Sequence, residues 1–157
     1  LIPKKEWYDA ITEAEDNIIR DCEMDIQGYD ISHDAIKASM ENARLAEVDH
    51  LIHFQQRALQ DLSHRKKYGF IITNPPYGQR LDSPEEMPEL YRDIGTVYKN
   101  LDSWSMYLIT AYEDAQRYIG KKADKNRKIY NGMMRTYFYQ YLGPKPPRRE
   151  KREENNH

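Results

Sequence analysis

The sequence has few of the residues that build disulfides, thiolate metal sites or membrane spans. Its one cysteine, Cys22, excludes an internal disulfide and a zinc site made of several cysteines. No apolar run approaches the roughly 18 residues that a membrane-spanning helix needs. Charged residues make up 32% of the chain and the mean hydropathy is −0.98. We therefore expect a cytoplasmic protein whose 157 residues can form one domain with a hydrophobic core.

The sequence also lacks a recognisable metal site. The histidines at 33, 50, 53 and 64 do not follow the spacing of known metal-binding patterns, and no glutamate completes one. Since thiolates are scarce as well, we expect these histidines on the surface or in packing, and we expect no bound metal.

Acidic residues are scarce toward the carboxyl terminus. Residues 115–152 hold twelve lysines and arginines but two acids, a net charge of +10, whereas residues 1–114 have a net charge of −10. A basic end on a chain whose total charge is −2 suggests a polyanionic partner. Residues 148–157 taken alone are equally typical of a solvated basic and polar tail, which we expect to be disordered.

One stretch, Tyr68-Gly-Phe-Ile-Ile-Thr-Asn-Pro-Pro-Tyr-Gly78, combines a strand signal with a loop signal. Its apolar, β-branched run over residues 70–73 is typical of a buried strand. The strand must end at Asn74, because the following prolines cannot donate to a sheet ladder and restrict the residue before them. Asn74 and Tyr77 are therefore predicted on a stiff loop at the carboxyl end of a strand, where open α/β sheets bind ligands.

The chemistry of this loop suits an amino group. The side-chain carbonyl of Asn74 and the main-chain carbonyl of Pro75 both accept hydrogen bonds. Two acceptors on a rigid backbone can hold one –NH₂ group and direct its lone pair toward an electrophile. Tyr77 offers a flat face on which a base can stack, an interaction of roughly 1–3 kcal/mol. The alternative is a Pro-Pro turn in which the asparagine and the tyrosine are incidental.

A second candidate site follows an earlier strand. Residues 25–30 read as a short strand that ends at an acid, Asp30, and a helix over residues 32–46 follows. Nucleotide-binding α/β folds use this order of strand, acid and helix to hold ribose hydroxyls. On this interpretation Asp30 binds the ribose of a cofactor and Ile31 packs against its adenine. The alternative is an ordinary helix start, where acids are favoured in any case.

The other predicted elements alternate along the chain. Apolar residues at helical spacing predict helices over residues 3–20, 89–99 and 112–119, and apolar runs predict strands over residues 51–55 and 106–110. Strands that alternate with helices favour an α/β fold with a mostly parallel sheet.

The basic end contains a predicted antiparallel hairpin over residues 127–142. Asn131-Gly132 is a strong signal for a tight turn, and the aromatic stretch after it alternates as a strand does. Basic residues beside aromatic ones suit a nucleic-acid surface. The candidate RNA-binding residues are Lys121, Lys122, Lys125, Arg127 and Lys128. The alternative is an aromatic strand that faces the core behind a solvated outer face, and both interpretations can hold together.

Taken together, the chain resembles the THUMP-associated rRNA guanine-N2 methyltransferases, class I enzymes dependent on S-adenosylmethionine (SAM) and long labelled N6-adenine-specific methylases. Asn74-Pro-Pro-Tyr77 carries the reaction class, and the basic Asn-Gly segment of residues 121–132 carries the subfamily. The resemblance spans residues 1–149 and includes Gly28-Tyr-Asp-Ile31, Glu41-Asn-Ala-Arg44, Leu90-Tyr-Arg-Asp-Ile-Gly95, Trp104-Ser105 and Tyr141-Leu-Gly-Pro-Lys145.

The resemblance implies a Rossmann-like methyltransferase sheet over residues 1–147, mostly parallel with a C-terminal antiparallel hairpin. It also implies that the first strand and the glycine-rich SAM loop are missing, because no Gly-x-Gly sequence occurs. In the family they lie upstream of the residues that resemble Leu1 to Trp7, as does the RNA-binding THUMP domain. Because that strand pairs in the middle of the sheet, we expect this chain to fold poorly and not to methylate on its own.

The resemblance also implies the roles of the site residues. The catalytic loop would be Asn74, Pro75, Pro76 and Tyr77, and the contacts to SAM would come from Asp30, Ile31, Asp61 and Asn74. Asp61 is the weaker assignment, because the aligned position for the acid that meets the adenine amino group holds Ala58.

The implied reaction is direct methyl transfer from SAM to an exocyclic amino group of a nucleobase. Guanine N2 in large-subunit ribosomal RNA leads and adenine N6 is the runner-up, because both present an aromatic –NH₂ group. A non-catalytic RNA-binding module of the same fold, and an unrelated α/β domain with a chance Pro-Pro turn, remain open.

Overall fold

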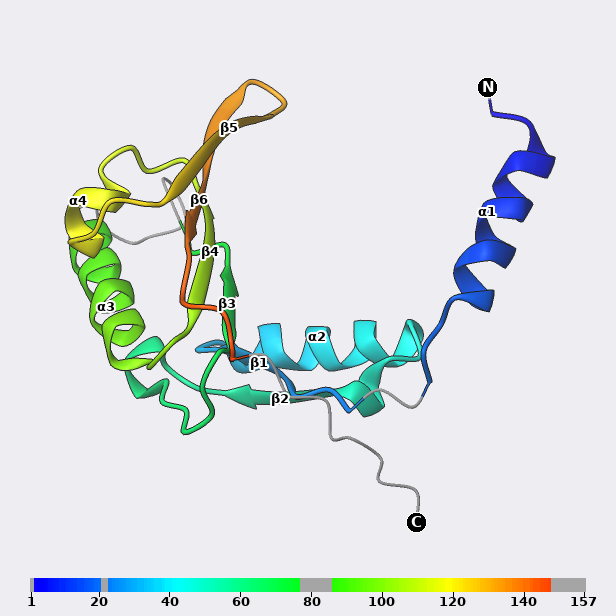
Figure 1. Cartoon of the computed structure of the whole chain (residues 1–157), viewed down its shortest axis with the longest axis horizontal. Coiled ribbons are helices and arrows are strands. Elements are labelled where there is room, and N and C mark those ends of the chain that lie inside the picture. The colour runs from blue at the N-terminus through cyan, green and yellow to red at the C-terminus, as the bar shows by residue number, and fades with distance from the viewer. Residues whose placement is uncertain (1, 21–22, 77–85, 148–157) are drawn as a thin grey trace, which may run out of the picture. The chain divides into compact units, whose positions relative to one another are not determined.

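The computed structural model describes residues 2–20, 23–76 and 86–147 (Figure 1). The chain divides into two compact units, Leu1–Gln56 and Arg57–His157, and each unit has its own sheet. None of the helices in the described ranges is long and apolar enough to cross a membrane.

The first unit is a two-stranded parallel sheet with a helix packed on it. Its elements are α1 (Lys4–Asp16), β1 (Ile26–Asp30), α2 (His33–Leu45), the 3-10 turn η1 (Asp49–Leu51) and β2 (Ile52–Gln56). Strands β1 and β2 are in register from Ile26 opposite Ile52 to Asp30 opposite Gln56. Of the two possible helix starts, Ser32 and Asp34, the structure uses Ser32 as the cap of α2, and its hydroxyl accepts from the backbone N–H of Ala35.

Little of the first unit is buried. Helix α2 buries Ile36 and Ala43, and no residue of α1 is buried. Helix α1 is also shorter than predicted, because it ends at Asp16 rather than at residue 20. A two-stranded sheet with so small a core is marginal on its own.

The second unit is a four-stranded sheet with two helices. Its elements are η2 (Leu59–Asp61), β3 (Phe70–Thr73), α3 (Glu86–Asn100), β4 (Ser105–Thr110), α4 (Ala115–Ile119), β5 (Lys125–Asn131) and β6 (Met134–Tyr141). The strand order is β3-β4-β6-β5, with β3 parallel to β4 and β6 antiparallel to both of its neighbours. The predicted α/β fold with a C-terminal antiparallel hairpin is therefore confirmed.

Helices α3 and α4 cover one face of this sheet (Figure 1). The core between them and the sheet contains Tyr91, Ile94, Met106, Leu108, Ala115, Ile119, Tyr139 and Tyr141. The two helices approach closely at Gly95, where an added Cβ would lie 2.3 Å from the carbonyl oxygen of Ile119. Helix α4 ends at Gly120 as predicted, with φ of 76°.

The opposite face of the sheet is aromatic and partly open. Phe70, Tyr107 and Phe138 form a ladder across three strands, with ring centroids 6.2 and 6.1 Å apart. The prediction of a buried strand over residues 70–73 is therefore half wrong: Phe70 is 64% and Ile72 83% exposed, whereas Ile71 packs against the core. The reason is that β3 is the edge strand and that α3 and α4 cover only one of its faces.

The hairpin forms close to its predicted bounds. Its strands run from Lys125 to Tyr141, and Asn131 pairs with Met134, so the turn residues are Gly132 and Met133 rather than Asn131 and Gly132. Gly132 has φ of 61°, the left-handed conformation that tight hairpin turns require.

Candidate functional site

Asn74 lies directly after β3, at the carboxyl edge of the four-stranded sheet. Thr73 pairs with Leu108, so the loop after β3 and the end of β4 at Thr110 share this edge. Pro75 is buried and Pro76 half-buried, whereas Asn74 is exposed. Within the described part of the chain the Asn74 amide has no hydrogen-bond partner. Tyr77, the last member of the predicted loop, lies outside the described residues.

A buried hydroxyl network supports the same edge from β4. Thr110 is fully buried, its hydroxyl lies 2.5 Å from that of Tyr91, and its Oγ1 accepts from the N–H of Tyr112. The rings of Tyr91 and Tyr112 are 5.0 Å apart, and burial raises the pKa of Tyr112. The turn after β4 is therefore stiff and carries neutral hydroxyls. Sequence analysis missed these residues, because nothing in the spacing of Tyr91 and Thr110 indicates that they meet.

An ion pair joins this turn to the hairpin. The guanidinium of Arg135 on β6 hydrogen-bonds the carboxylate of Glu113, and the hydroxyl of Tyr137 donates to the same carboxylate at 3.2 Å. The hydrogen bond from Arg135 is the main cause of the lowered pKa of Glu113, and Tyr137 adds to it. Since Glu113 follows β4 closely, the pair fastens the outer hairpin to the edge that carries Asn74.

In the first unit, Asp30 forms a turn that presents its side chain at a strand end. Its Oδ1 accepts from the N–H of Ser32 at 2.8 Å, which forms an Asx-turn. The side chain of Gln56 at the end of β2 donates to the carbonyl of Ile31 at 2.9 Å. Ile31 is exposed, as a residue that packs against a ligand must be.

Asp61 is exposed in η2 of the second unit. Its neighbour Gln60 donates to Asp93 on α3 at 2.7 Å, so η2 is tied to the helix layer of that unit. Asp61 and Asn74 thus belong to the second unit, whereas Asp30 and Ile31 belong to the first. These four residues each lie at a strand end or turn of their own unit.

The five predicted RNA-binding residues are all exposed. Lys125, Arg127 and Lys128 lie on β5, and Lys121 and Lys122 lie in the loop that leads to it. The ammonium of Lys121 lies 5.3 Å from the ring centroid of Tyr98. These residues therefore add positive charge without being needed for the core.

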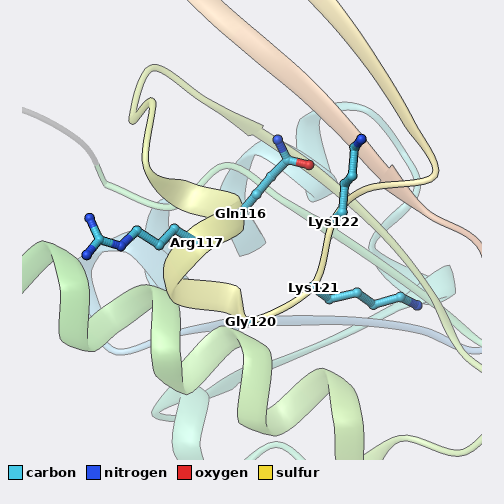
Figure 2. Close-up of a pocket in the computed structure, with 5 residues that line it drawn as sticks. All are labelled: Gln116, Arg117, Gly120, Lys121 and Lys122. Atoms are coloured by element: carbon cyan, nitrogen blue, oxygen red, sulfur yellow. The ribbon is translucent and has the colours of Figure 1, made fainter.

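The loop between α4 and β5 lines a shallow hollow together with the end of α4. Gln116, Arg117, Gly120, Lys121 and Lys122 surround it. Figure 2 shows the side chains of Arg117, Lys121 and Lys122 pointing in different directions. They therefore do not converge on one anion, and the hollow is better described as a basic corner of the surface than as a binding site.

Comparison with known proteins relates this chain to methyltransferases. A family model described as "RMKL-like, methyltransferase domain" matches residues 2–140. The Bacillus subtilis protein named "Putative RNA methyltransferase YpsC" is 36% identical over 152 residues, which cover 97% of this chain and 40% of that protein. The "Ribosomal RNA large subunit methyltransferase K/L" of Syntrophotalea carbinolica is 36% identical over 112 residues, which cover 68% of this chain and 16% of that protein.

A solved structure agrees with the fold. SMU.472, described as "a putative methyltransferase complexed with SAH", superposes with a TM-score of 0.82 at 31% identity, over 93% of this chain and 39% of that chain. The chain therefore spans less than half the length of these similar proteins.

Proposed function

Because this chain belongs to the RMKL-like methyltransferase-domain family, we propose that it methylates an exocyclic amino group of a nucleobase in RNA, with SAM as cofactor. The observation that carries the proposal is the position of Asn74. An exposed amide that precedes a buried proline at the carboxyl edge of a parallel strand pair suits the capture of an amino group. The family match excludes the unrelated α/β domain that the sequence left open.

The residues present fit the adenosine part of SAM. SMU.472 was solved with SAH, the demethylated form of SAM, which supports this cofactor for the family fold. The exposed carboxylate of Asp30 is the proposed acceptor for ribose hydroxyls, and exposed Ile31 is the proposed apolar surface for adenine. Asp61 is the proposed partner of the adenine amino group. When bound, SAM supplies an electrophilic methyl group.

The loop after β3 orients the nucleophile. The side-chain carbonyl of Asn74 and the main-chain carbonyl of Pro75 accept hydrogen bonds from the target –NH₂ group, which directs its lone pair. The same two dipoles stabilise the positive charge that develops on nitrogen. Pro76 keeps the loop rigid, and we propose that Tyr77 stacks on the base once it has left its helix.

We propose guanine N2 of large-subunit ribosomal RNA as the target. The name of the Syntrophotalea carbinolica relative supports ribosomal RNA as the substrate class. Adenine N6 is the alternative, because it presents the same aromatic amino group to the loop. Mass spectrometry of the methylated nucleoside separates these two targets.

The whole protein's partners are proposals of the same kind. We expect a THUMP domain and the first part of the methyltransferase domain in the full-length gene product, which fits the 40% share of YpsC that this chain spans. A ribosomal RNA substrate is also consistent with a cytoplasmic location.

Replacing Asn74 tests the proposal. In the full-length gene product, Asn74→Ala should lower the methylation rate of unmethylated large-subunit ribosomal RNA by a factor of about 100 or more, because the amino group loses an acceptor present in the transition state. The affinity for SAM, measured by calorimetry, should change little. The matched control is Asn100→Ala, an exposed asparagine at the end of α3.

Two outcomes of these measurements would contradict the proposal. Equal losses of methylation and SAM affinity in Asn74→Ala would refute the assigned role. Failure of the full-length wild type to bind SAM would instead favour a non-catalytic RNA-binding module of the same fold.

A further inference from the structure

The hairpin tip, residues 129–136, extends beyond the rest of the sheet (Figure 1). The last residue of β4, Thr110, pairs with Tyr137, so the outer pairs of the hairpin have no neighbour on β4. At a rise near 3.4 Å per residue, the tip reaches about 10 Å past the end of β4. Because β4 is parallel to β3, the tip overhangs the edge at which Asn74 follows β3.

The hairpin tip is held in a defined conformation. Gly132 supplies the left-handed residue of a two-residue turn, with φ of 61°. The hydroxyl of Thr136, which is buried, donates to the carbonyl of Ile129 across the hairpin at 2.8 Å. At its base, Arg135 pairs with Glu113 of the turn after β4. The tip is therefore a stiff projection rather than a loose loop.

The hairpin tip exposes apolar side chains that are not part of the hydrophobic core. Tyr130 is 67% exposed, and Ile129, Met133 and Met134 are exposed as well. These side chains contribute nothing to the helix-covered core of the second unit. A cluster of exposed apolar side chains on a stiff projection is typical of a contact with a partner.

The charge around the hairpin tip favours a polyanion as that partner. Residues 121–135 carry six lysines and arginines and one acid, Asp124. The carboxylate of Asp124 accepts from the N–H of Leu142 at 2.8 Å, so it has a structural role. Arg127 and Lys128 are exposed on β5 just before the tip. Basic side chains that flank an exposed aromatic one can contact phosphates while the ring packs on a base.

We infer that the hairpin tip holds the RNA open beside the target base, and this inference rests on the proposed function. Tyr130 and Met133 pack against the nucleobase next to the target, and Arg127 and Lys128 contact the phosphates on either side. An amino group inside an RNA helix cannot reach Asn74 until its nucleotide leaves the stack. A stiff apolar projection at the same edge replaces the stacking that the neighbouring base loses.

Removing the tip side chains tests this role. In the full-length gene product, Tyr130→Ala combined with Met133→Ala should raise the KM for unmethylated large-subunit ribosomal RNA by about tenfold. The affinity for SAM and the thermal melting curve should stay as in the wild type, because both residues are exposed. Tyr130→Phe should retain the wild-type KM, because the ring that stacks is kept. The matched control is Tyr8→Ala, whose side chain is 63% exposed on α1.

A salt titration tests the two cations separately. Arg127→Ala with Lys128→Ala should reduce the slope of log affinity for the same RNA against log salt by about 0.7–0.9 for each charge removed. Lys99→Ala, an exposed lysine on α3, should leave the slope unchanged.

The failures can be told apart. If the wild type methylates no ribosomal RNA, the proposed function is wrong. If the wild type methylates it and the Tyr130/Met133 double variant has the wild-type KM, the inference about the hairpin tip alone is wrong. A parallel loss of SAM affinity in the double variant would also overturn the inference, since the tip would then be shaping the cofactor site.

Discussion

At the scale of single residues, burying the hydroxyl of Tyr141 costs folding free energy. Its side chain is fully buried, and within the described part of the chain its hydroxyl has no hydrogen-bond partner. Burial also raises the pKa of this hydroxyl well above its ordinary value, so the group stays neutral. An unsatisfied buried hydroxyl destabilises a fold by about 1–3 kcal/mol.

We therefore expect Tyr141→Phe to raise the free energy of unfolding of the full-length gene product by about 1 kcal/mol. The comparison is Tyr139→Phe on the same strand, where the hydroxyl hydrogen-bonds the side chain of Gln116 and its loss should lower stability. Urea denaturation measures both. A less stable Tyr141→Phe variant would mean that the hydroxyl has a partner after all.

The chemistry of single residues made the position of the loop after β3 predictable, but it did not reveal the long-range contacts that hold the neighbouring segments. The Pro-Pro pair is enough to end β3 at Thr73 and expose Asn74. Trp104 shows the opposite case, since no role for it could be predicted beyond its part in the family resemblance. In the structure its indole N–H donates to the carbonyl of Lys66, and an added Cβ on Gly69 would lie 2.5 Å from its ring. Contacts between residues so distant in sequence leave no periodic signal.

At the scale of elements, the close approach of α3 and α4 depends on Gly95. Alanine would improve the helix propensity of α3 by about 1 kcal/mol. An added Cβ, however, would lie 2.3 Å from the Ile119 carbonyl oxygen, which is backbone and cannot rotate away. We expect Gly95→Ala to lower stability by a net amount of about 1–2 kcal/mol.

Thermal unfolding of the full-length gene product checks this expectation. Thr96→Ala is the control, because Thr96 is exposed on the next position of α3 and only its hydroxyl contacts the carbonyl of Arg92. A Tm for Gly95→Ala equal to that of the control would show that the two helices can separate at no cost.

The attachment of the hairpin should depend on pH through Glu113. Its pKa is lowered from 4.5, first by the hydrogen bond from Arg135, then by Tyr137 and more weakly by the charge of Lys128. A carboxyl group with a lowered folded-state pKa contributes stability above its unfolded-state value of 4.5, and that contribution is lost as the pH falls through the folded-state pKa.

The protection factors of amides in the hairpin tip, which correct for the slower intrinsic exchange at acid pH, should therefore fall on acidification while the sheet core stays protected. Glu113→Gln should show fast exchange of the tip already at neutral pH and no further step on acidification. If the tip of the wild type keeps its protection at a pH well below the lowered pKa of Glu113, where this carboxyl is protonated, the ion pair does not hold the tip.

At the scale of the whole molecule, the sequence predicted the order of elements better than their burial. Alternating strands and helices indicated the α/β fold, and the Asn-Gly pair indicated the hairpin, because both signals are local. The exposed face of Phe70 and Ile72 could not be predicted, since an apolar run looks the same whether one or both of its faces are covered. The two separate sheets bear on the expectation of a missing mid-sheet strand, which came from the family resemblance and not from a local signal, and which stays a prediction.

Those two sheets lead to the last prediction. The first unit buries only Ile36 and Ala43 among its described residues, whereas the second has a continuous aromatic and aliphatic core. We expect the isolated 157-residue chain to show protected amides in the second unit and fast exchange in the first. Because Asp30 would then be mobile, we also expect calorimetry to detect SAM binding by the full-length gene product and none by the isolated chain. A stable, SAM-binding monomer of 157 residues would contradict this, and it would mean that the two-stranded sheet and α2 suffice to hold the ribose site.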